Sequence, residues 1–117
     1  PRQVQLAVAS NKYQSATEKL VAHYFPTIRF AAVYGQREGI ATKPDPTIVF
    51  DILKQTSIAP DDTLYVGDSG VDMQTALNAH ITACGVTWGF RPRTELEAFC
   101  PKHIVDTTEA IENIVLA

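Results

Sequence analysis

Short apolar runs alternate with stretches of helical periodicity along the whole chain. The runs predict strands at residues 4–9, 28–34, 63–66, 81–86 and 103–105. The periodic stretches predict helices at residues 14–24, 71–79, 94–99 and 107–116, and one more that starts at Asp45-Pro46. The runs are apolar throughout instead of alternating with polar residues, which is typical of a parallel sheet covered on both faces. The pattern therefore predicts one α/β domain over residues 1–117.

Polar side chains stand where three of the predicted strands end. Ser10 and Asn11 follow the first strand, Lys43 lies in the loop after the second, and Asp68 ends the third. Right-handed crossovers bring the carboxyl ends of parallel strands to one edge of a sheet, where ligands bind. A hydroxyl, an ammonium group, a carboxylate and the N–H groups of a helix N-terminus would together suit a phosphoryl group. An acid at this edge also suits Mg²⁺.

The residues of the first two predicted strand ends have purely structural interpretations as well. Ser10 and Asn11 can cap the next helix, and taken alone this is the favoured interpretation. A single lysine such as Lys43 is usually solvated. However, Pro44 restricts the backbone of Lys43 and a helix starts directly after it, so its position is unusually well defined.

The stretch around Asp68 gives a stronger functional signal. Ser69 and Asp72 have the spacing of a capping box, so Asp72 can serve only the start of its helix. Ser15 and Glu18 have the same spacing at the start of the first helix. Because Ser69 already fills the capping role, a functional role is favoured for Asp68.

Composition narrows the class of protein. The chain is 45% hydrophobic with a formal net charge of -3, which argues against non-specific binding to nucleic acid or to an anionic membrane. No apolar run approaches the roughly 20 residues of a membrane-spanning helix. Cys84 and Cys100 lack the spacing of a metal or redox pair, and the three histidines are scattered. The sequence therefore favours a reduced, cytoplasmic protein.

Three motifs in order resemble those of the haloacid dehalogenase-like hydrolases, and more narrowly the phosphoglycolate-phosphatase-like branch. They are Ser10-Asn11-Lys12, Lys43-Pro44-Asp45-Pro46 and Val66-Gly67-Asp68-Ser69-x-x-Asp72. The stretch Gly85–Gly89 is similar to the loop after the fifth core strand of that family. The resemblance runs from about Val4 to the C-terminus.

The resemblance implies a three-layer α/β/α Rossmann-like core that hydrolyses a small phosphorylated metabolite with Mg²⁺, through an aspartyl-phosphate. Ser10 matches a position that hydrogen-bonds the transferring phosphoryl group, with Asn11 beside it. Lys43 matches the lysine that pairs with the phosphate and the nucleophile. Asp68 matches a Mg²⁺ ligand, and Asp72 the acid that holds a metal-bound water or supports Lys43.

One departure from the family pattern decides what this chain can do. The family's first motif, Asp-x-Asp at the tip of the central strand, carries the nucleophile and the general acid/base, and the sequence contains no such motif. The cap domain that selects the substrate is not found either. We therefore expect the C-terminal part of a longer phosphatase, inactive by itself. The absent strand would lie between strands 4–9 and 63–67, so either another segment or chain supplies it or these two strands pair directly.

Other classes of function fit the sequence less well. A non-catalytic α/β binding or interaction domain that lacks the nucleophile would have the same sequence pattern. A phosphoacceptor receiver domain needs an acidic pair after its first strand, where this chain has Ser10-Asn11. The sequence gives still less support to a nucleotide-binding domain, because it contains neither a P-loop motif nor GxGxxG. The sequence leaves the substrate and the oligomeric state open.

Overall fold

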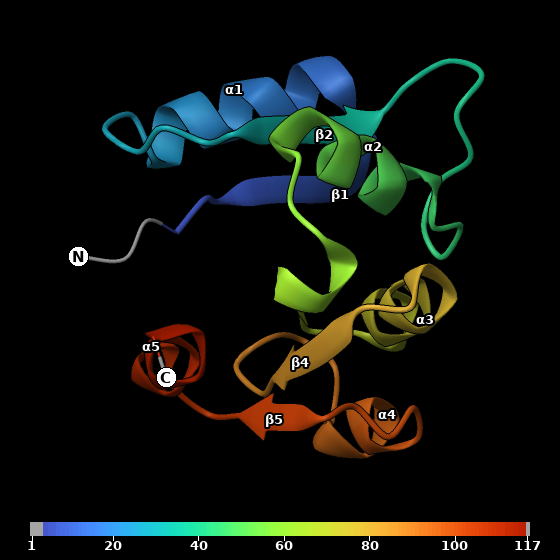
Figure 1. The fold of residues 1–117 in the computed structure, drawn as a ribbon, viewed down its shortest axis with the longest axis vertical. Coiled ribbons are helices and arrows are strands. Elements are labelled where there is room, and N and C mark those ends of the chain that lie inside the picture. The colour runs from blue at the N-terminus through green and yellow to red at the C-terminus, as the bar shows by residue number, and fades with distance from the viewer. Residues whose placement is uncertain (1–3, 117) are drawn as a thin grey trace. The chain divides into compact units, whose positions relative to one another are not determined.

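The computed structural model describes residues 4–116. Along the chain the elements are β1 (Ala7–Tyr13), α1 (Gln14–Tyr24), β2 (Ala32–Gln36), α2 (Thr47–Thr56), the short 3-10 helix η1 (Pro60–Asp62), β3 (Leu64–Gly67), α3 (Gly70–Ala79), β4 (Thr82–Val86), α4 (Arg93–Glu97), β5 (His103–Val105) and α5 (Thr108–Leu116) (Figure 1). This order confirms the predicted alternation of strands and helices. The chain divides into two compact units, Pro1–Ile58 and Ala59–Ala117.

The N-terminal unit is built on a two-stranded parallel sheet. Ala7, Val8 and Ala9 of β1 pair with Ala32, Val33 and Tyr34 of β2, and the register then shifts before Tyr13. The side chain of Gln14, at the start of α1, bridges to β2: its amide nitrogen donates to the carbonyl oxygen of Val33 at 2.8 Å, and its oxygen accepts from the N–H of Gly35 at 2.6 Å. The helix and the strand are thereby held together at one end.

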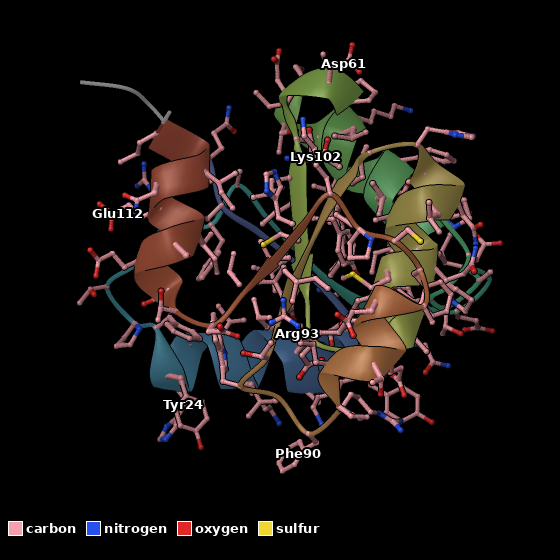
Figure 2. The ribbon with its side chains drawn as sticks, turned by 90° about the horizontal axis from the view of Figure 1, so that it is seen from below. Tyr24, Asp61, Phe90, Arg93, Lys102 and Glu112 are labelled. Carbon is pink, nitrogen blue, oxygen red and sulfur yellow. The ribbon has the colours of Figure 1, made fainter. Side chains whose placement is uncertain are left out.

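The C-terminal unit is a three-stranded parallel sheet in the order β3-β4-β5. In both views α3 and α4 lie on one side of this sheet and α5 on the other, which gives three layers (Figures 1 and 2). Its core contains the buried side chains of Met73, Ala76, Ala83 and Leu96. The central strand β4 is almost entirely buried, as its apolar sequence requires, whereas Val66 of the edge strand β3 is exposed.

The sheets differ in one respect from the expectation. A single parallel sheet was predicted, but the described strands form two sheets, with β1 in the first and β3 at an edge of the second. Within the described residues, β1 and β3 are therefore not hydrogen-bonded to each other. A strand supplied by another segment or chain stays a prediction, as does a single domain over residues 1–117.

The helix starts confirm some of the local predictions and correct others. The capping box predicted for Ser15 and Glu18 is wrong: α1 begins at Gln14, no side chain caps it, and Glu18 accepts a hydrogen bond from the Gln14 side chain instead. The prediction of Asp45 as N-cap and Pro46 as first helical residue is wrong by one position, because Pro46 is the N-cap of α2, but the Asp45 carboxylate still accepts hydrogen bonds from the backbone and hydroxyl of Thr47. That helix begins at Thr47, one residue later than expected.

Candidate active site

Ser10 lies where the regular pairing of β1 with β2 ends. The strand continues to Tyr13, so Ser10 and Asn11 lie inside it and not beyond its end, but the register is irregular after Ala9. The hydroxyl oxygen of Ser10 accepts a hydrogen bond from the N–H of Lys12 at 3.0 Å. The helix-cap interpretation of Ser10 and Asn11 is therefore wrong, because neither caps α1. The hydrogen bond of Ser10 lies instead within the part of β1 where the register with β2 shifts.

Asn11 holds the backbone of Lys43 from both sides. Its side-chain oxygen accepts from the N–H of Lys43 at 2.9 Å, and its side-chain nitrogen donates to the carbonyl oxygen of Lys43 at 3.2 Å. The ammonium group of Lys43 also donates to the carbonyl oxygen of Ala9 at 3.3 Å. The structure thus brings Lys43 to the end of the β1 ladder, beside Ser10 and Asn11, as predicted from the order of the strands.

The helix after Lys43 is anchored through Asp45. Hydrogen bonds from the Thr47 side chain and backbone hold the pKa of the Asp45 carboxyl below its usual range. A charged acceptor at a helix start satisfies an N–H group that has no partner within the helix. The backbone of Lys43 is therefore held by Asn11, and the helix start that follows it is stabilised by Asp45.

Asp72 braces the turn that carries Asp68. One of its carboxylate oxygens accepts hydrogen bonds from the N–H of Asp68 at 3.1 Å and from the hydroxyl of Ser69 at 3.2 Å. The hydroxyl oxygen of Ser69 in turn accepts from the N–H of Asp72 at 3.3 Å. Ser69 is thus confirmed as the N-cap of α3, and the other half of the predicted capping box takes a different form, in which Asp72 accepts from the N–H of Asp68 and the hydroxyl of Ser69. Asp72 itself is only 8% exposed, so its described contacts are part of the local fold.

Two residues around this brace were not predicted. The hydroxyl of Tyr65 donates to the other carboxylate oxygen of Asp72 at 3.1 Å. Burial first, and the charge of Asp72 second, raise the pKa of Tyr65 above its ordinary value. A Cβ atom on Gly67 would lie 2.2 Å from the Cβ of Asp72, so only glycine fits there. A tyrosine in an apolar strand that leads into Gly-Asp was the available sequence signal.

Asp68 presents the one candidate metal ligand of the turn. Its side chain is partly buried, and no residue in the described range 4–116 donates a hydrogen bond to its carboxylate. An oxygen donor of this kind fits the Mg²⁺ that the resemblance implies. Among the residues described, however, no group of three or more His, Cys, Asp or Glu side chains is placed to hold a metal ion. Asp68 can therefore provide one ligand of a metal site, and the described residues do not bring the other ligands together around it.

No helix in the described range is both long and apolar enough to cross a membrane.

Cys84 and Cys100 are both free, the first buried and the second exposed. Burial raises the pKa of the Cys84 thiol. Neither thiol therefore contributes to the candidate site.

Comparison with known proteins gives consistent relatives. A phosphoglycolate phosphatase of Pseudomonas putida is 26% identical over 92% of this chain and 40% of the relative. One of Mesorhizobium japonicum is 30% identical over 91% of this chain and 46% of the relative. The crystal structure of a candidate phosphoglycolate phosphatase from Lactobacillus delbrueckii subsp. bulgaricus has a TM-score of 0.89 and 38% identity, covering 96% of this chain and 46% of that one.

The identities and coverages show how much of each relative this chain matches, and a family model shows where the chain belongs. The chain spans about half the length, or less, of the relatives it matches. Residues 1–86 match the family model described as haloacid dehalogenase-like hydrolase. The α/β fold with parallel strands that the sequence predicted agrees with the solved structure. The chain belongs to the haloacid dehalogenase-like hydrolase family.

Proposed function

We propose that this chain is the C-terminal part of the catalytic core of a Mg²⁺-dependent phosphate-monoester hydrolase that acts on a small metabolite such as 2-phosphoglycolate. The observation that carries the proposal is the reciprocal pair of hydrogen bonds by which Asn11 holds Lys43. A loop lysine without a function does not need its backbone fixed from both sides. The names of the relatives support the choice of reaction and substrate.

Lys43 and Ser10 bind the transferring phosphoryl group in this proposal. The ammonium group provides a positive charge for the phosphoryl oxygens, and the hydroxyl provides a short hydrogen bond. Asn11 acts one step away, because it determines where the lysine backbone lies. These roles need the groups to be held before the substrate arrives, so that little reorganisation accompanies the reaction.

Asp68 would hold Mg²⁺, with Asp72 in the supporting role of keeping the Asp68 turn in place. When bound, the cation neutralises charge on the phosphoryl group. The relatives are about twice as long as this chain, and we place the further carboxylate ligands and the aspartyl nucleophile outside it. The absence of a covalent nucleophile can cost on the order of 10⁶ in rate, so this chain alone should be inactive.

A cytoplasmic location is part of the same proposal. A chain with two free thiols, one of them buried, is expected in a reducing compartment. Small phosphorylated metabolites are also substrates that a cytoplasmic enzyme would encounter.

The test compares two proteins: this chain alone, and the complete protein, meaning this chain with all coding sequence continuous with it. Each is assayed for hydrolysis of 2-phosphoglycolate and p-nitrophenyl phosphate, with Mg²⁺ and with chelator. We expect Mg²⁺-dependent hydrolysis by the complete protein and none by this chain. Hydrolysis by this chain alone would contradict the proposal.

A second candidate function is a non-catalytic binding or interaction domain of the same fold. The absence of Asp-x-Asp from the sequence favours it, as does the lack of a three-ligand metal group in the described part of the chain. Failure of the complete protein to hydrolyse either ester would support this function instead.

A further inference from the structure

The β4–α4 loop and the helix α4 that follows it each contact the segment around Asp68 at one point. The first is Gly89, which lies against the Asp68 side chain. A Cβ atom on Gly89 would lie 2.3 Å from a carboxylate oxygen of Asp68, 2.5 Å from its Cβ and 2.7 Å from its Cγ. All three distances are shorter than atoms tolerate, and one of the atoms is the Asp68 Cβ, which does not move when the side chain rotates. Any other residue at position 89 would therefore push the backbone of the Asp68 turn and the loop apart and displace the Asp68 carboxylate.

Glycine is required at position 89 for space and not for its backbone. Among the described residues the only glycine with a positive φ is Gly39, so the backbone of Gly89 is one that alanine can adopt. The effect of a methyl group at this position would therefore fall mainly on Asp68. This separates position 89 from glycines that are needed for a turn.

The second contact point is Glu95. One of its carboxylate oxygens accepts a hydrogen bond of 2.7 Å from the N–H of Gly70, the first residue of α3. This N–H has no partner within the helix, and a negative charge there interacts favourably with the helix dipole. Glu95 therefore caps, from a distant part of the sequence, the helix that begins two residues after Asp68.

The loop that carries Gly89 is fixed at both of its ends. A carboxylate oxygen of Asp106 accepts from the hydroxyl of Thr87 at 2.6 Å and lies 3.4 Å from a guanidinium nitrogen of Arg93. Thr87 directly follows β4, and Arg93 is the first residue of α4. Phe90, by contrast, is fully exposed and projects away from the sheet (Figure 2). The ends of the loop are thus held while its tip extends into solvent.

We propose that the β4–α4 loop and α4 together form a positioning element for the metal ligand of this site, in which Gly89 sets the position of the Asp68 carboxylate and Glu95 holds the start of α3. The proposal rests on the proposed function in one respect, namely that Asp68 binds Mg²⁺. Neither residue touches the metal or the substrate, and both act through the Asp68 turn.

Two substitutions with matched controls test the proposal in the complete protein. Gly89→Ala is paired with Gly85→Ala, in which the new methyl group would meet the Leu96 side chain at 3.2 Å instead of Asp68. Glu95→Ala is paired with Glu97→Ala on the same helix, where Glu97 is exposed and lies 3.5 Å from Arg93. Glu95→Gln serves as the conservative variant, because its amide oxygen still accepts from Gly70.

The first measurement is the Mg²⁺ concentration that gives half-maximal hydrolysis. Loss of a residue that orients a metal ligand typically costs about 10–100-fold in affinity. We expect Gly89→Ala and Glu95→Ala to raise the half-saturating concentration by about this factor, with Glu95→Gln recovering most of it. Gly85→Ala should lower the melting temperature without changing the Mg²⁺ requirement, and Glu97→Ala should change neither. Wild-type Mg²⁺ dependence in Gly89→Ala would overturn the proposal.

The second measurement does not depend on activity. Crystal structures of the wild type and of Gly89→Ala should show the Asp68 carboxylate displaced in the variant. Failure of the wild type to hydrolyse phosphate esters would count against the proposed function only, since the position of the Asp68 carboxylate is still compared. An unchanged Asp68 side chain in Gly89→Ala would overturn the positioning role whatever the activity.

Discussion

The Lys43 segment of the N-terminal unit and the Asp68 turn of the C-terminal unit are held in opposite ways. Lys43 is held by hydrogen bonds between exposed groups that lie 32 residues apart. The Asp68 turn is held by a buried carboxylate only four residues away, which also accepts the Tyr65 hydroxyl. Exposed hydrogen bonds contribute little net free energy, whereas a buried donor left without a partner is costly. Changes near Lys43 should therefore affect activity alone, and changes near Asp72 stability as well.

The largest effects are expected from Lys43 and Asp68, the groups to which our proposal assigns the phosphoryl group and the metal. In the complete protein, Lys43→Ala and Asp68→Asn should each lower kcat about 10²–10³-fold, the usual cost of one group aimed at developing charge. Steady-state hydrolysis of 2-phosphoglycolate measures this. Lys54→Ala and Asp61→Asn are the controls, since both residues are exposed and Asp61 lies in η1 (Figure 2). Wild-type rates in either site variant would remove that residue from the site.

Asn11→Ala comes next, and it tests the Lys43 side of the comparison. Without the reciprocal hydrogen bonds the lysine backbone can shift, and a displacement of about 1 Å can cost up to about 10²-fold in rate. The melting temperature should hardly change, because the lost bonds are exposed. Kinetics and thermal unfolding of the same sample separate the two effects. A large loss of stability together with an unchanged rate would reverse our interpretation of Asn11.

Asp72→Ala tests the buried side of the comparison. It leaves the Tyr65 hydroxyl and the Asp68 N–H without this acceptor, and a buried group without a partner costs about 1–3 kcal/mol. Urea unfolding of the complete protein should show this loss together with reduced activity. The exposed Asp61→Ala should stay within about 0.5 kcal/mol of the wild type. Equal stability of the two variants would show that the hydrogen bonds of Asp72 do not stabilise the fold.

The smallest effect concerns the acid limb of stability. The pKa of Asp45 is lowered by its hydrogen bonds to Thr47, so its contribution is present above the unfolded value and is lost as the pH falls through the lower folded value. This loss of stability occurs below about pH 4. Asp45→Asn keeps a good capping residue but removes the titration, and should flatten this part of the stability curve. An acid limb that is unchanged from that of the wild type would contradict this role.

The parts of the site that the sequence predicted are those encoded by local patterns. The capping of α3 by Ser69 and the order of the strands follow from spacing and from apolar runs, as does the position of Asp45 beside the start of α2. The hydrogen bonds between Asn11 and Lys43 could not be predicted from the sequence, because a contact across 32 residues depends on how the loop after β2 returns to β1. Gly89 was missed for a related reason: in a loop, glycine usually indicates a turn, and its contact with Asp68 arises only in the folded chain.

The two helix starts show why nearby signals can fail. Ser15 and Glu18 have the spacing of a capping box, yet the Gln14 side chain bonds to β2 and α1 begins at Gln14, with Tyr13 and not Ser15 at the N-cap position. Tertiary contacts therefore override a local pattern there. At Asp72 the tertiary contact from Tyr65 acts together with the local pattern, and the prediction was confirmed.

The central claim is that this chain carries phosphate-binding and metal-binding groups but not the nucleophile. Brief reaction of the complete protein with 2-phosphoglycolate and Mg²⁺, followed by acid quenching and peptide mass spectrometry, tests it most directly. We predict a phosphoryl group on an aspartate outside these 117 residues. A phosphoryl group on Asp68, Asp72 or Ser10 would contradict the claim.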